Sequence, residues 1–407
     1  MRILYSLFIH LYGLTLRASS ILGHRRAKQW VEGRILKVNK SAQKCVWFHC
    51  ASLGEYEQAL PIIEKVRFEF PEKRIVISFF SPSGYNIVSN SNNVDEVVYF
   101  PLDTRRNAKE FIDAINPEVA IFVKYEFWFN HILELNHRKI NTYFISVLFR
   151  ENHFLLNPFM GRLREIVKSL DAIFVQDEAS VELLKKYNFE NLHLSGDTRY
   201  DRVMEIVNKA KKNEKVARFK GISKLIVVGS SWQAEEKIIR DFDGINGGNG
   251  NYKILIAPHD ISEKHLQEIE EKFNDSIIRY SAYDKQEVSV LLVDNIGLLS
   301  SIYRYADMAF VGGGYSNALH NILEPAANGI PVVYGDNNSK FPEAKALELK
   351  GGGKSVSDSK QFFNYVNRLF TDKELEETVG KQSRQFIEER LGATDKIFEF
   401  IFNNKGS

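Results

Sequence analysis

Short runs of apolar residues alternate along most of the chain with longer stretches in which apolar residues recur every three or four positions. The runs predict buried strands, and the stretches between them predict amphipathic helices. The first series of runs covers residues 44–50, 74–80, 96–100, 119–123, 142–147, 172–175 and 192–195. The second series covers residues 225–229, 253–257, 288–293, 308–311 and 331–334. Because strands that alternate with helices form parallel sheets, the pattern predicts an α/β protein with two doubly wound, Rossmann-like domains.

The two series also indicate where one domain ends and the next begins. A chain of 407 residues is too long for one ordinary domain. A highly charged stretch separates the two series and is expected to be a linker. We therefore predict, in chain order, a basic N-terminal segment (1–40), a first domain (41–208), the linker (209–222), a second domain (223–385) and a C-terminal helix (386–407) that could pack back on the first domain.

The segment before the first strand has the pattern of an amphipathic helix. Residues 3–16 are mostly apolar, and one helical stripe collects Arg2, Ser6, His10, Gly13 and Arg17. Arg17 interrupts the apolar run before it reaches the roughly 18 residues that a membrane-spanning helix needs. The pattern favours a helix that lies in the membrane interface. A helix packed in the protein core, a signal peptide and a true span are the alternatives.

The distribution of charge supports a membrane surface as the partner and argues against nucleic acid. Residues 1–44 hold nine Lys or Arg and one acidic residue, Glu32, for a net charge of +8, although the whole chain carries only +2. The body of the protein is therefore mildly acidic, which does not suit a nucleic-acid backbone. We expect the basic segment to bind anionic lipids on the cytoplasmic face of an inner membrane.

The composition is otherwise that of a globular protein, with 44% hydrophobic and 26% charged residues. The two cysteines, Cys45 and Cys50, lie an odd number of positions apart on one predicted strand and should face opposite sides of the sheet. They provide neither a disulfide framework nor a zinc-binding spacing, which suits a reducing compartment. No acidic pair stands at metal-ligand spacing, so no metal is expected in the site.

A glycine-rich stretch near the end of the second series is the strongest sign of a ligand site. Three glycines, Gly312 to Gly314, follow a predicted strand, and His320 and Asn321 are expected to open a short helix with Glu324 at the capping-box position. Free N–H groups at such a turn and helix start favour a phosphate. A tight connection without a ligand is one alternative. A dinucleotide site is another, although Asn317 stands where that motif has Gly or Ala.

Polar clusters follow predicted strands in both domains. They are Ser52 to Glu55, Glu126, Ser230 and Ser231, Pro258 and His259, and Gly312 to Glu324. The carboxyl ends of parallel strands meet at one edge of a sheet, and ligands bind there in doubly wound folds. Two such domains that face each other would therefore leave a cleft lined by these clusters.

These clusters, in this order, resemble the 3-deoxy-D-manno-octulosonic acid (Kdo) transferases of lipopolysaccharide assembly. The matching motifs are Ser52-Leu-Gly-Glu55, Ser81-Pro-Ser-Gly84, Glu126-Phe-Trp128, Gly196-Asp-Thr-Arg199, Gly229-Ser-Ser231 with Glu235-Glu236, Gly312-Gly313 and His320-Asn-Ile-Leu-Glu324. The resemblance runs from about residue 46 to residue 348. It implies an inverting glycosyltransferase of the two-domain GT-B fold, which moves Kdo from CMP-Kdo to a glucosamine hydroxyl of the lipid A precursor (lipid IVA).

Four features depart from the pattern of that family. Lys124 stands where an acidic residue is usual, and Phe129 replaces the Pro that usually follows the Trp of the motif. His259 and Asp260 follow Pro258 where Arg and His are usual, and the loop after the glycines is shorter. These differences concern the acceptor contacts and the neutralisation of phosphate, and they leave the reaction class unchanged.

The resemblance also implies roles for single residues. Glu55 would be the catalytic base. The acceptor-binding residues would be Ser52, Gly54, Glu126 and Trp128. The donor-binding residues would be Ser230, Ser231, Pro258, His259, Gly312, Gly313, Gly314, His320, Asn321, Glu324 and Arg199. Each side chain also has an ordinary structural explanation, since Glu55 suits the first turn of a helix, Glu324 a cap and Trp128 simple packing.

Two other functions remain alternatives on the sequence alone. A GT-B transferase that uses a UDP-sugar would share the fold and differ in its donor. A non-catalytic nucleotide-sugar-binding protein at the membrane would belong to a different class, and the presence of Glu55 argues against it.

Overall fold

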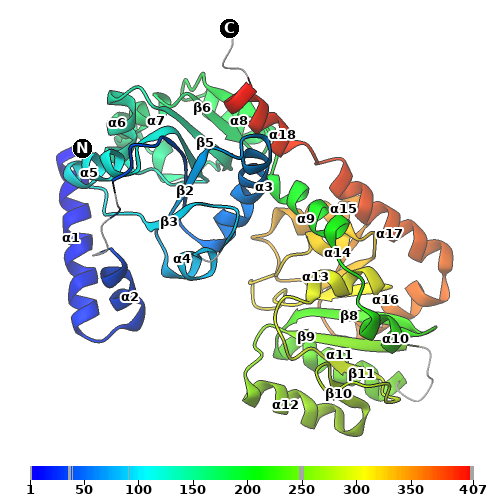
Figure 1. Cartoon of the computed structure of the whole chain (residues 1–407). Helices are drawn as coiled ribbons and strands as arrows, with labels where there is room; N and C mark the ends of the chain where they lie inside the picture. The colour runs from blue at the N-terminus through cyan, green and yellow to red at the C-terminus, as the bar shows by residue number, and fades with distance from the viewer. Residues whose placement is uncertain (1, 35–37, 39, 90, 247–251, 404–407) are drawn as a thin grey trace. The chain divides into compact units, whose positions relative to one another are not determined.

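The computed structural model describes residues 2–34, 38, 40–89, 91–246 and 252–403. Contacts divide the chain into two compact units, the first made of Met1–Arg202 with Leu391–Ser407 and the second of Val203–Arg390 (Figure 1). The division falls within helix α9 (Thr198–Lys209). The predicted linker at 209–222 lies in the second unit and contains helix α10 (Glu214–Lys220). This helix is amphipathic although the stretch is highly charged, since Val216 and Phe219 are buried. The Asn213 side chain caps it by accepting the Val216 N–H.

The first unit is built on a seven-stranded parallel sheet in the order β3-β2-β1-β4-β5-β6-β7. The strand order reverses between β1 and β4, and ligands bind outside the carboxyl ends at such a switch point. The strands are β1 (Cys45–Cys50), β2 (Arg74–Phe79), β3 (Glu96–Tyr99), β4 (Pro117–Val123), β5 (Asn141–Val147), β6 (Ala172–Val175) and β7 (Leu192–Leu194).

Two hydrophobic cores cover the two faces of this sheet. Cys45 and Trp47 lie in one core, whereas Phe48 and Cys50 lie in the other, so the two cysteines face opposite sides as predicted. The second core also contains Ile397 of the C-terminal helix α18 (Ala393–Phe398), which packs against α3 (Leu53–Glu69). The other helices on this sheet are α4 (Pro82–Val88), α5 (Arg105–Ile115), α6 (Phe129–His137), α7 (Gly161–Lys168) and α8 (Glu178–Lys185), with short turns η1 (Phe154–Leu156), η2 (Pro158–Met160) and η5 (Glu399–Asn403).

Two further helices, α1 (Arg2–Ile21) and α2 (Arg25–Gly33), pack against each other as an N-terminal hairpin on the first unit (Figure 1). Ile9 and Gly13 of α1 are buried. The pattern had placed Gly13 on a polar stripe, but a Cβ there would lie 2.6 Å from Leu102 Cδ1, so glycine permits close packing. The neighbouring face of α1 is apolar and exposed, and it comprises Leu7, Phe8, Leu11 and Leu14.

The second unit repeats the architecture with a seven-stranded parallel sheet in the order β10-β11-β9-β8-β12-β13-β14. Its switch point lies between β8 and β12. The strands are β8 (Lys224–Ser231), β9 (Tyr252–Pro258), β10 (Ile277–Arg279), β11 (Val290–Leu292), β12 (Met308–Val311), β13 (Val332–Gly335) and β14 (Gly353–Val356). The helices are α11 (Gln233–Asn246), α12 (Glu263–Phe273), α13 (Leu299–Ile302), α14 (Leu323–Ala327), α15 (Pro342–Lys350), α16 (Ser359–Thr371) and α17 (Lys373–Glu388), with turns η3 (Asn274–Ser276) and η4 (Tyr303–Tyr305).

Candidate functional site

Four of the five predicted polar clusters lie at the carboxyl ends of the strands that flank each switch point, and the fifth, Pro258 and His259, lies at the end of β9 beside β8. In the first unit, Ser52 and Glu55 follow β1, and Glu126 and Trp128 follow its neighbour β4. In the second unit, the serine cluster closes β8 and the glycine stretch follows its neighbour β12. Ligands of doubly wound folds bind at these positions, so each unit offers one candidate site.

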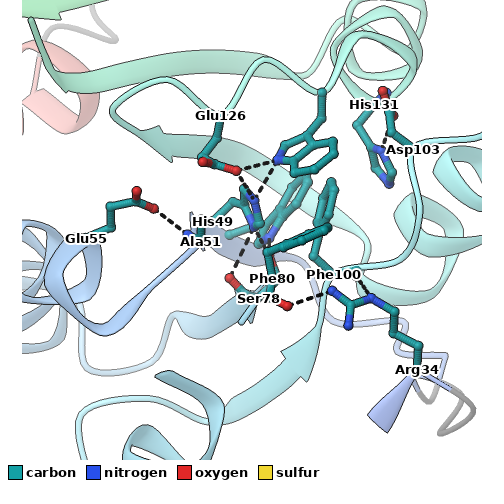
Figure 2. Close-up of polar contacts among 12 residues, drawn as sticks. Arg34, His49, Ala51, Glu55, Ser78, Phe80, Phe100, Asp103, Glu126 and His131 are labelled. Carbon is teal, nitrogen blue, oxygen red and sulfur yellow. Dashed lines mark hydrogen bonds and ion pairs between the residues drawn. The ribbon is translucent and has the colours of Figure 1, made fainter. Parts of the chain in front are cut away.

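Glu55 lies in the first turn of α3, for which Ser52 is the N-cap residue without a side-chain capping bond. Its carboxylate accepts the Ala51 N–H (Figure 2). Gly54, directly before this acid, does not form the turn, because it is already helical and has open space around it. The residue that turns the chain from strand to helix is the extended Ser52.

The environment of Glu55 suits a base that works near neutral pH. Partial burial raises the pKa of Glu55 to about 7, and the negative charge of Glu126 adds to the increase. The Ala51 N–H and the positive charge of Lys124 oppose this increase in pKa. Lys124 directly follows β4 and has the left-handed backbone conformation, with φ of 60°, where the chain leaves the sheet towards Glu126.

Glu126 is held by a network of side chains behind it (Figure 2). The Trp128 indole Nε1–H donates to Glu126 Oε2 at 2.7 Å and also lies 2.9 Å from His49 Nε2. His49 is completely buried, which lowers its pKa and keeps the imidazole neutral. His49 Nε2 also lies 3.3 Å from Glu126 Oε2, and the other imidazole nitrogen, Nδ1, lies 2.8 Å from Ser78 Oγ. Trp128 therefore positions the carboxylate as well as contributing to packing.

The sequence did not single out His49 or Ser78, which anchor this network from inside the sheet. Both point out of central strands, and both are completely buried. Ser78 Oγ also accepts the indole N–H of Trp47 at 2.8 Å. A polar residue in an otherwise apolar strand was the available signal, because a buried polar side chain needs a partner.

In the second unit, the three glycines are required by close backbone contacts. A Cβ on Gly312 would lie 2.1 Å from the Ser230 carbonyl oxygen, and one on Gly314 would lie 2.4 Å from the Gly335 backbone nitrogen. Gly313 adopts a φ of +85°. The expectation of free N–H groups needs correction here, because the Gly312 N–H donates to the Gly229 carbonyl and the Gly313 N–H to Glu235 Oε1.

Two buried carboxylates hold the ends of β8 and β12. Glu235 also accepts the Trp232 N–H at 3.1 Å. Glu236 accepts from Ser231 Oγ at 3.3 Å and is paired with His265 at 2.9 Å and Lys272 at 3.3 Å. Among the predicted residues, Ser231 is thus buried in this network, whereas Ser230 bends the strand end with a φ of 52°.

Three aromatic rings gather outside the same strand ends. Trp232, which the sequence analysis missed, stacks on His259 with ring centroids 4.4 Å apart and donates its indole N–H to His320 Nε2 at 3.1 Å. Pro258 ends β9 and places His259 beside them. Burial and the neighbouring His259 lower the pKa of His320, which favours the neutral imidazole, and the stacked rings offer a flat surface for a ligand.

The helix after the glycines begins later than predicted, at Leu323. Asn321 precedes it and accepts the Leu323 N–H at 3.0 Å, so it turns the chain without forming the expected capping box. Glu324 instead accepts from Ser300 Oγ at 2.8 Å and from the Asn321 side-chain amide at 3.1 Å. Arg199, which was grouped with the donor residues of the second unit, lies in the first unit and pairs with Asp197 at 2.8 Å.

Two further properties of the described residues concern membranes and metal ions. No helix there is both long enough and apolar enough to cross a bilayer. No group of three or more His, Cys, Asp or Glu side chains in that part of the chain has an arrangement that could hold a metal ion.

Comparisons with known proteins agree with this architecture. Residues 25–202 match the family model of the 3-deoxy-D-manno-octulosonic-acid (Kdo) transferases. The Kdo transferase of Aquifex aeolicus is 28% identical over 353 residues, which are 85% of this chain and 91% of that protein. In fold, the chain is similar to the UDP-GlcNAc 2-epimerase of Neisseria meningitidis, with a TM-score of 0.64 at 14% identity, over 89% of this chain and 100% of that one. The calicheamicin glycosyltransferase CalG4 gives a TM-score of 0.55 at 12% identity, over 89% and 100% of the two chains.

The two parallel sheets and the structural similarities identify the GT-B fold. The similarity to Kdo transferases makes the chain a glycosyltransferase. Residues 25–202 belong to the Kdo transferase family, and the similarity to Kdo transferases extends over most of the chain. The family and the fold inferred from the motif order are both confirmed.

Proposed function

We propose that this protein transfers Kdo from CMP-Kdo to a glucosamine hydroxyl of a lipid A precursor, lipid IVA, with inversion at the anomeric carbon. The second unit would bind the donor through Ser230, His259, His320, Asn321 and Glu324. The first unit would bind the acceptor near Glu126 and Trp128 and supply the base, Glu55. The similarity to Kdo transferases over 85% of the chain supports the sugar and the reaction class.

The proposed step is a direct displacement. The acceptor hydroxyl loses its proton to the Glu55 carboxylate while its oxygen bonds to the anomeric carbon of Kdo. The bond from that carbon to the phosphate oxygen breaks on the opposite face, and CMP leaves with the electron pair. One carboxylate suffices, because inversion requires no covalent sugar–enzyme intermediate. The reaction would run without a metal ion, with protein hydrogen-bond donors stabilising the phosphate.

The environment of Glu55 carries the assignment of the base. A carboxylate with an ordinary pKa near 4.5 would be a weak proton acceptor, whereas a pKa of about 7 allows Glu55 to take a proton and still be ionised in part at neutral pH. Capping of α3 by the same carboxylate is compatible with this role, because only one of its oxygens accepts the Ala51 N–H.

The experiment that tests the function is incubation of the full chain with lipid IVA and either CMP-Kdo or a panel of UDP-sugars, followed by mass analysis of the lipid. A mass increase equal to one or more Kdo residues with CMP-Kdo alone supports the proposal. Transfer from a UDP-sugar, or binding of nucleotide sugars without any transfer, would replace it with one of the two alternatives.

We propose further that the N-terminal hairpin holds the protein on the cytoplasmic face of the inner membrane. Leu7, Leu11 and Leu14 are spaced for one face of α1, and their exposed fractions are 55%, 53% and 59%. This apolar face on a segment of net positive charge has the composition of an interfacial helix.

The membrane proposal predicts that replacing Leu7, Leu11 and Leu14 together by Gln abolishes most binding to anionic vesicles in a flotation assay. Leu349→Gln is the control, because Leu349 is an exposed leucine of the second unit. Equal flotation of the triple variant and the wild type would show that another surface binds the membrane.

A further inference from the structure

Arg34, at the end of α2, makes three hydrogen bonds to backbone carbonyls, and Figure 2 draws the two that reach Phe80 and Phe100. Its guanidinium donates to Phe100 O at 2.8 Å, Phe80 O at 2.7 Å and Trp30 O at 3.1 Å. It also stacks on Trp30, with the guanidinium carbon 3.5 Å from the ring centroid. Among the described residues, no carboxylate pairs with this arginine. A half-buried cation committed to carbonyl groups acts as a clamp on the loops that follow β2 and β3.

The two clamped residues carry the rings on which Trp128 packs. Phe80 stacks on Trp128 with centroids 5.0 Å apart, and Phe100 contacts Trp128 at 5.2 Å. The Trp128 indole in turn holds Glu126. A continuous series of contacts therefore joins Arg34 of the hairpin to the Glu126 carboxylate.

The other helix of the hairpin supports the same segment from α6. The Tyr5 hydroxyl donates to Asp103 Oδ2 at 2.6 Å. Asp103 is completely buried and accepts the N–H groups of Asn130 and His131, each at 3.0 Å, in the first turn of α6. This turn follows Trp128 directly along the chain.

Residues 124–128 have no helix or strand of their own to fix them. Their backbone hydrogen bonds include a local one from the Trp128 N–H to the Glu126 carbonyl and one from the Lys124 N–H to the Ile145 carbonyl of β5. The direction of the Glu126 side chain must therefore come from its contacts with Trp128 and His49 and from the start of α6. The hairpin supports Trp128 and the start of α6.

We propose that the N-terminal hairpin positions the Glu126–Trp128 segment, with Arg34 and Tyr5 as positioning residues, so that sugar transfer depends on how the hairpin is docked. This inference rests on the proposed function and goes beyond it, because there the hairpin only binds the membrane. It implies that the hairpin, which is proposed to face the membrane, and the acceptor-side residues Glu126 and Trp128 move together.

The test compares Arg34→Gln and Tyr5→Phe with the wild type, and uses Lys28→Gln as the matched control. Lys28 lies on the same helix, and its side chain is 62% exposed. Hydrogen exchange of the peptide that spans residues 124–131 should become faster in Arg34→Gln and Tyr5→Phe and stay unchanged in Lys28→Gln. The rate of Kdo transfer should fall about 10- to 100-fold in Arg34→Gln, since small misplacements of catalytic groups have effects of this size. Arg34→Lys should recover only part of the rate, because Lys lacks the planar fork of donors.

A pH profile separates positioning from a general loss of structure. The charged groups that act on Glu55 are Glu126, which raises its pKa, and Lys124, which lowers it. If Arg34→Gln lets Glu126 move away, the pKa of Glu55 falls and the acidic limb of kcat/KM moves to lower pH. Arg34 is not among the charged groups that act on Glu55, so loss of its charge alone should leave the limb in place, and a shift to lower pH identifies movement of Glu126.

The outcomes are distinguishable from failure of the proposed function. Inactivity of the wild type with CMP-Kdo would refute the function, and hydrogen exchange would still decide whether the hairpin holds the segment. Exchange in Arg34→Gln and Tyr5→Phe equal to that in Lys28→Gln overturns the inference. An active wild type whose Arg34→Gln variant exchanges faster but keeps its rate and pH profile also overturns it. CMP affinity should be the same in all variants, because the donor residues lie in the second unit.

Discussion

The carboxyl ends of the two sheets each carry a pair of acidic residues, but the two pairs are in opposite situations. Glu235 and Glu236 of the second unit are completely buried, and Glu236 is paired with Lys272 and His265. Glu55 and Glu126 of the first unit are only half-buried, and in the described part of the chain no Lys or Arg pairs with either. Glu235 and Glu236 are fixed by hydrogen bonds and ion pairs to their neighbours, whereas Glu55 has a pKa of about 7.

The difference indicates that acidic residues at equivalent positions of two similar folds have different roles. A buried acid whose oxygens accept backbone N–H groups serves to hold a loop, as Glu235 does for Gly313 and Trp232. An acid that lies beside a second negative charge, with little positive charge nearby, is costly to ionise, so its pKa is raised. A carboxyl group with such a pKa can take up and release a proton near neutral pH. The second unit therefore has the features of a rigid binding platform, and the first unit those of a reactive site.

The most severe test of this contrast is Glu55→Gln, which keeps the size of the side chain and an acceptor for the Ala51 N–H. We expect transfer to fall by about 10²–10⁴-fold, the usual effect of losing a general base. The measurement is Kdo transfer under single-turnover conditions with saturating CMP-Kdo. CMP affinity and vesicle binding should be unchanged, which makes them the controls. A rate within about threefold of wild type would mean that another group takes the proton, and Glu126 would be tested next.

A donor-side carboxylate should show the opposite behaviour. Glu324→Ala removes a group that is held by Ser300 and Asn321 and is proposed to accept the ribose hydroxyls. We expect CMP affinity to weaken about 10- to 100-fold, since hydrogen bonds to charged groups contribute about 1.5–3 kcal/mol. Calorimetry with CMP measures it, with Glu55→Ala as the variant that should bind normally. Equal affinity in Glu324→Ala and wild type would remove the ribose role.

Substitution of an acid that holds the structure should lower the stability of the protein and affect the chemical step least. Glu235→Ala leaves the N–H groups of Gly313 and Trp232 without their acceptor, which should cost about 1–3 kcal/mol. Native-state hydrogen exchange of β12 amides reports this loss. Glu235→Gln should retain most of the stability because an acceptor oxygen remains. Glu377→Ala, on the exposed surface of α17, should leave exchange unchanged. If all three variants behave alike, Glu235 does not hold the loop.

The fold was largely predictable because its signal is repeated. Twelve of the fourteen strands in the described residues appear as apolar runs between helical stretches, most of them because strands buried on both faces must be apolar. The strands missed were β10 and β14, which are short edge strands. Half-exposed residues fill β10, and β14 reads Gly-Lys-Ser-Val, so neither has an apolar run.

The site was predictable in its position and less so in its contacts. Strand ends at a switch point follow from topology, and the polar clusters there are visible in the sequence. The partners that position them come from distant strands, as His49 does for Trp128. The N–H groups of the glycines were expected to be free because no local pattern shows that Glu235, 78 positions away, accepts one of them. Local spacing predicts which residues reach an edge, and tertiary packing decides what they bond to.

The smallest expected effect is a shift in a pH profile, and it tests the interaction within the reactive pair. Only ionised Glu55 can accept a proton, so kcat/KM should rise with pH through the pKa of Glu55, about 7. Glu126→Gln removes the negative charge that contributes to this raised pKa and keeps an oxygen for the Trp128 indole. The pKa of Glu55 should then fall, and the variant should reach its full rate at a lower pH than the wild type. Burial is the larger cause and remains, so the shift should be partial.

Glu118→Gln, at the opposite end of β4, is the control that removes a charge of the same sign from the first unit without this shift. If the acidic limb of the kcat/KM profile has the same midpoint in Glu126→Gln as in the wild type, the two carboxylates titrate independently. Burial, without Glu126, would then be what raises the pKa of the base.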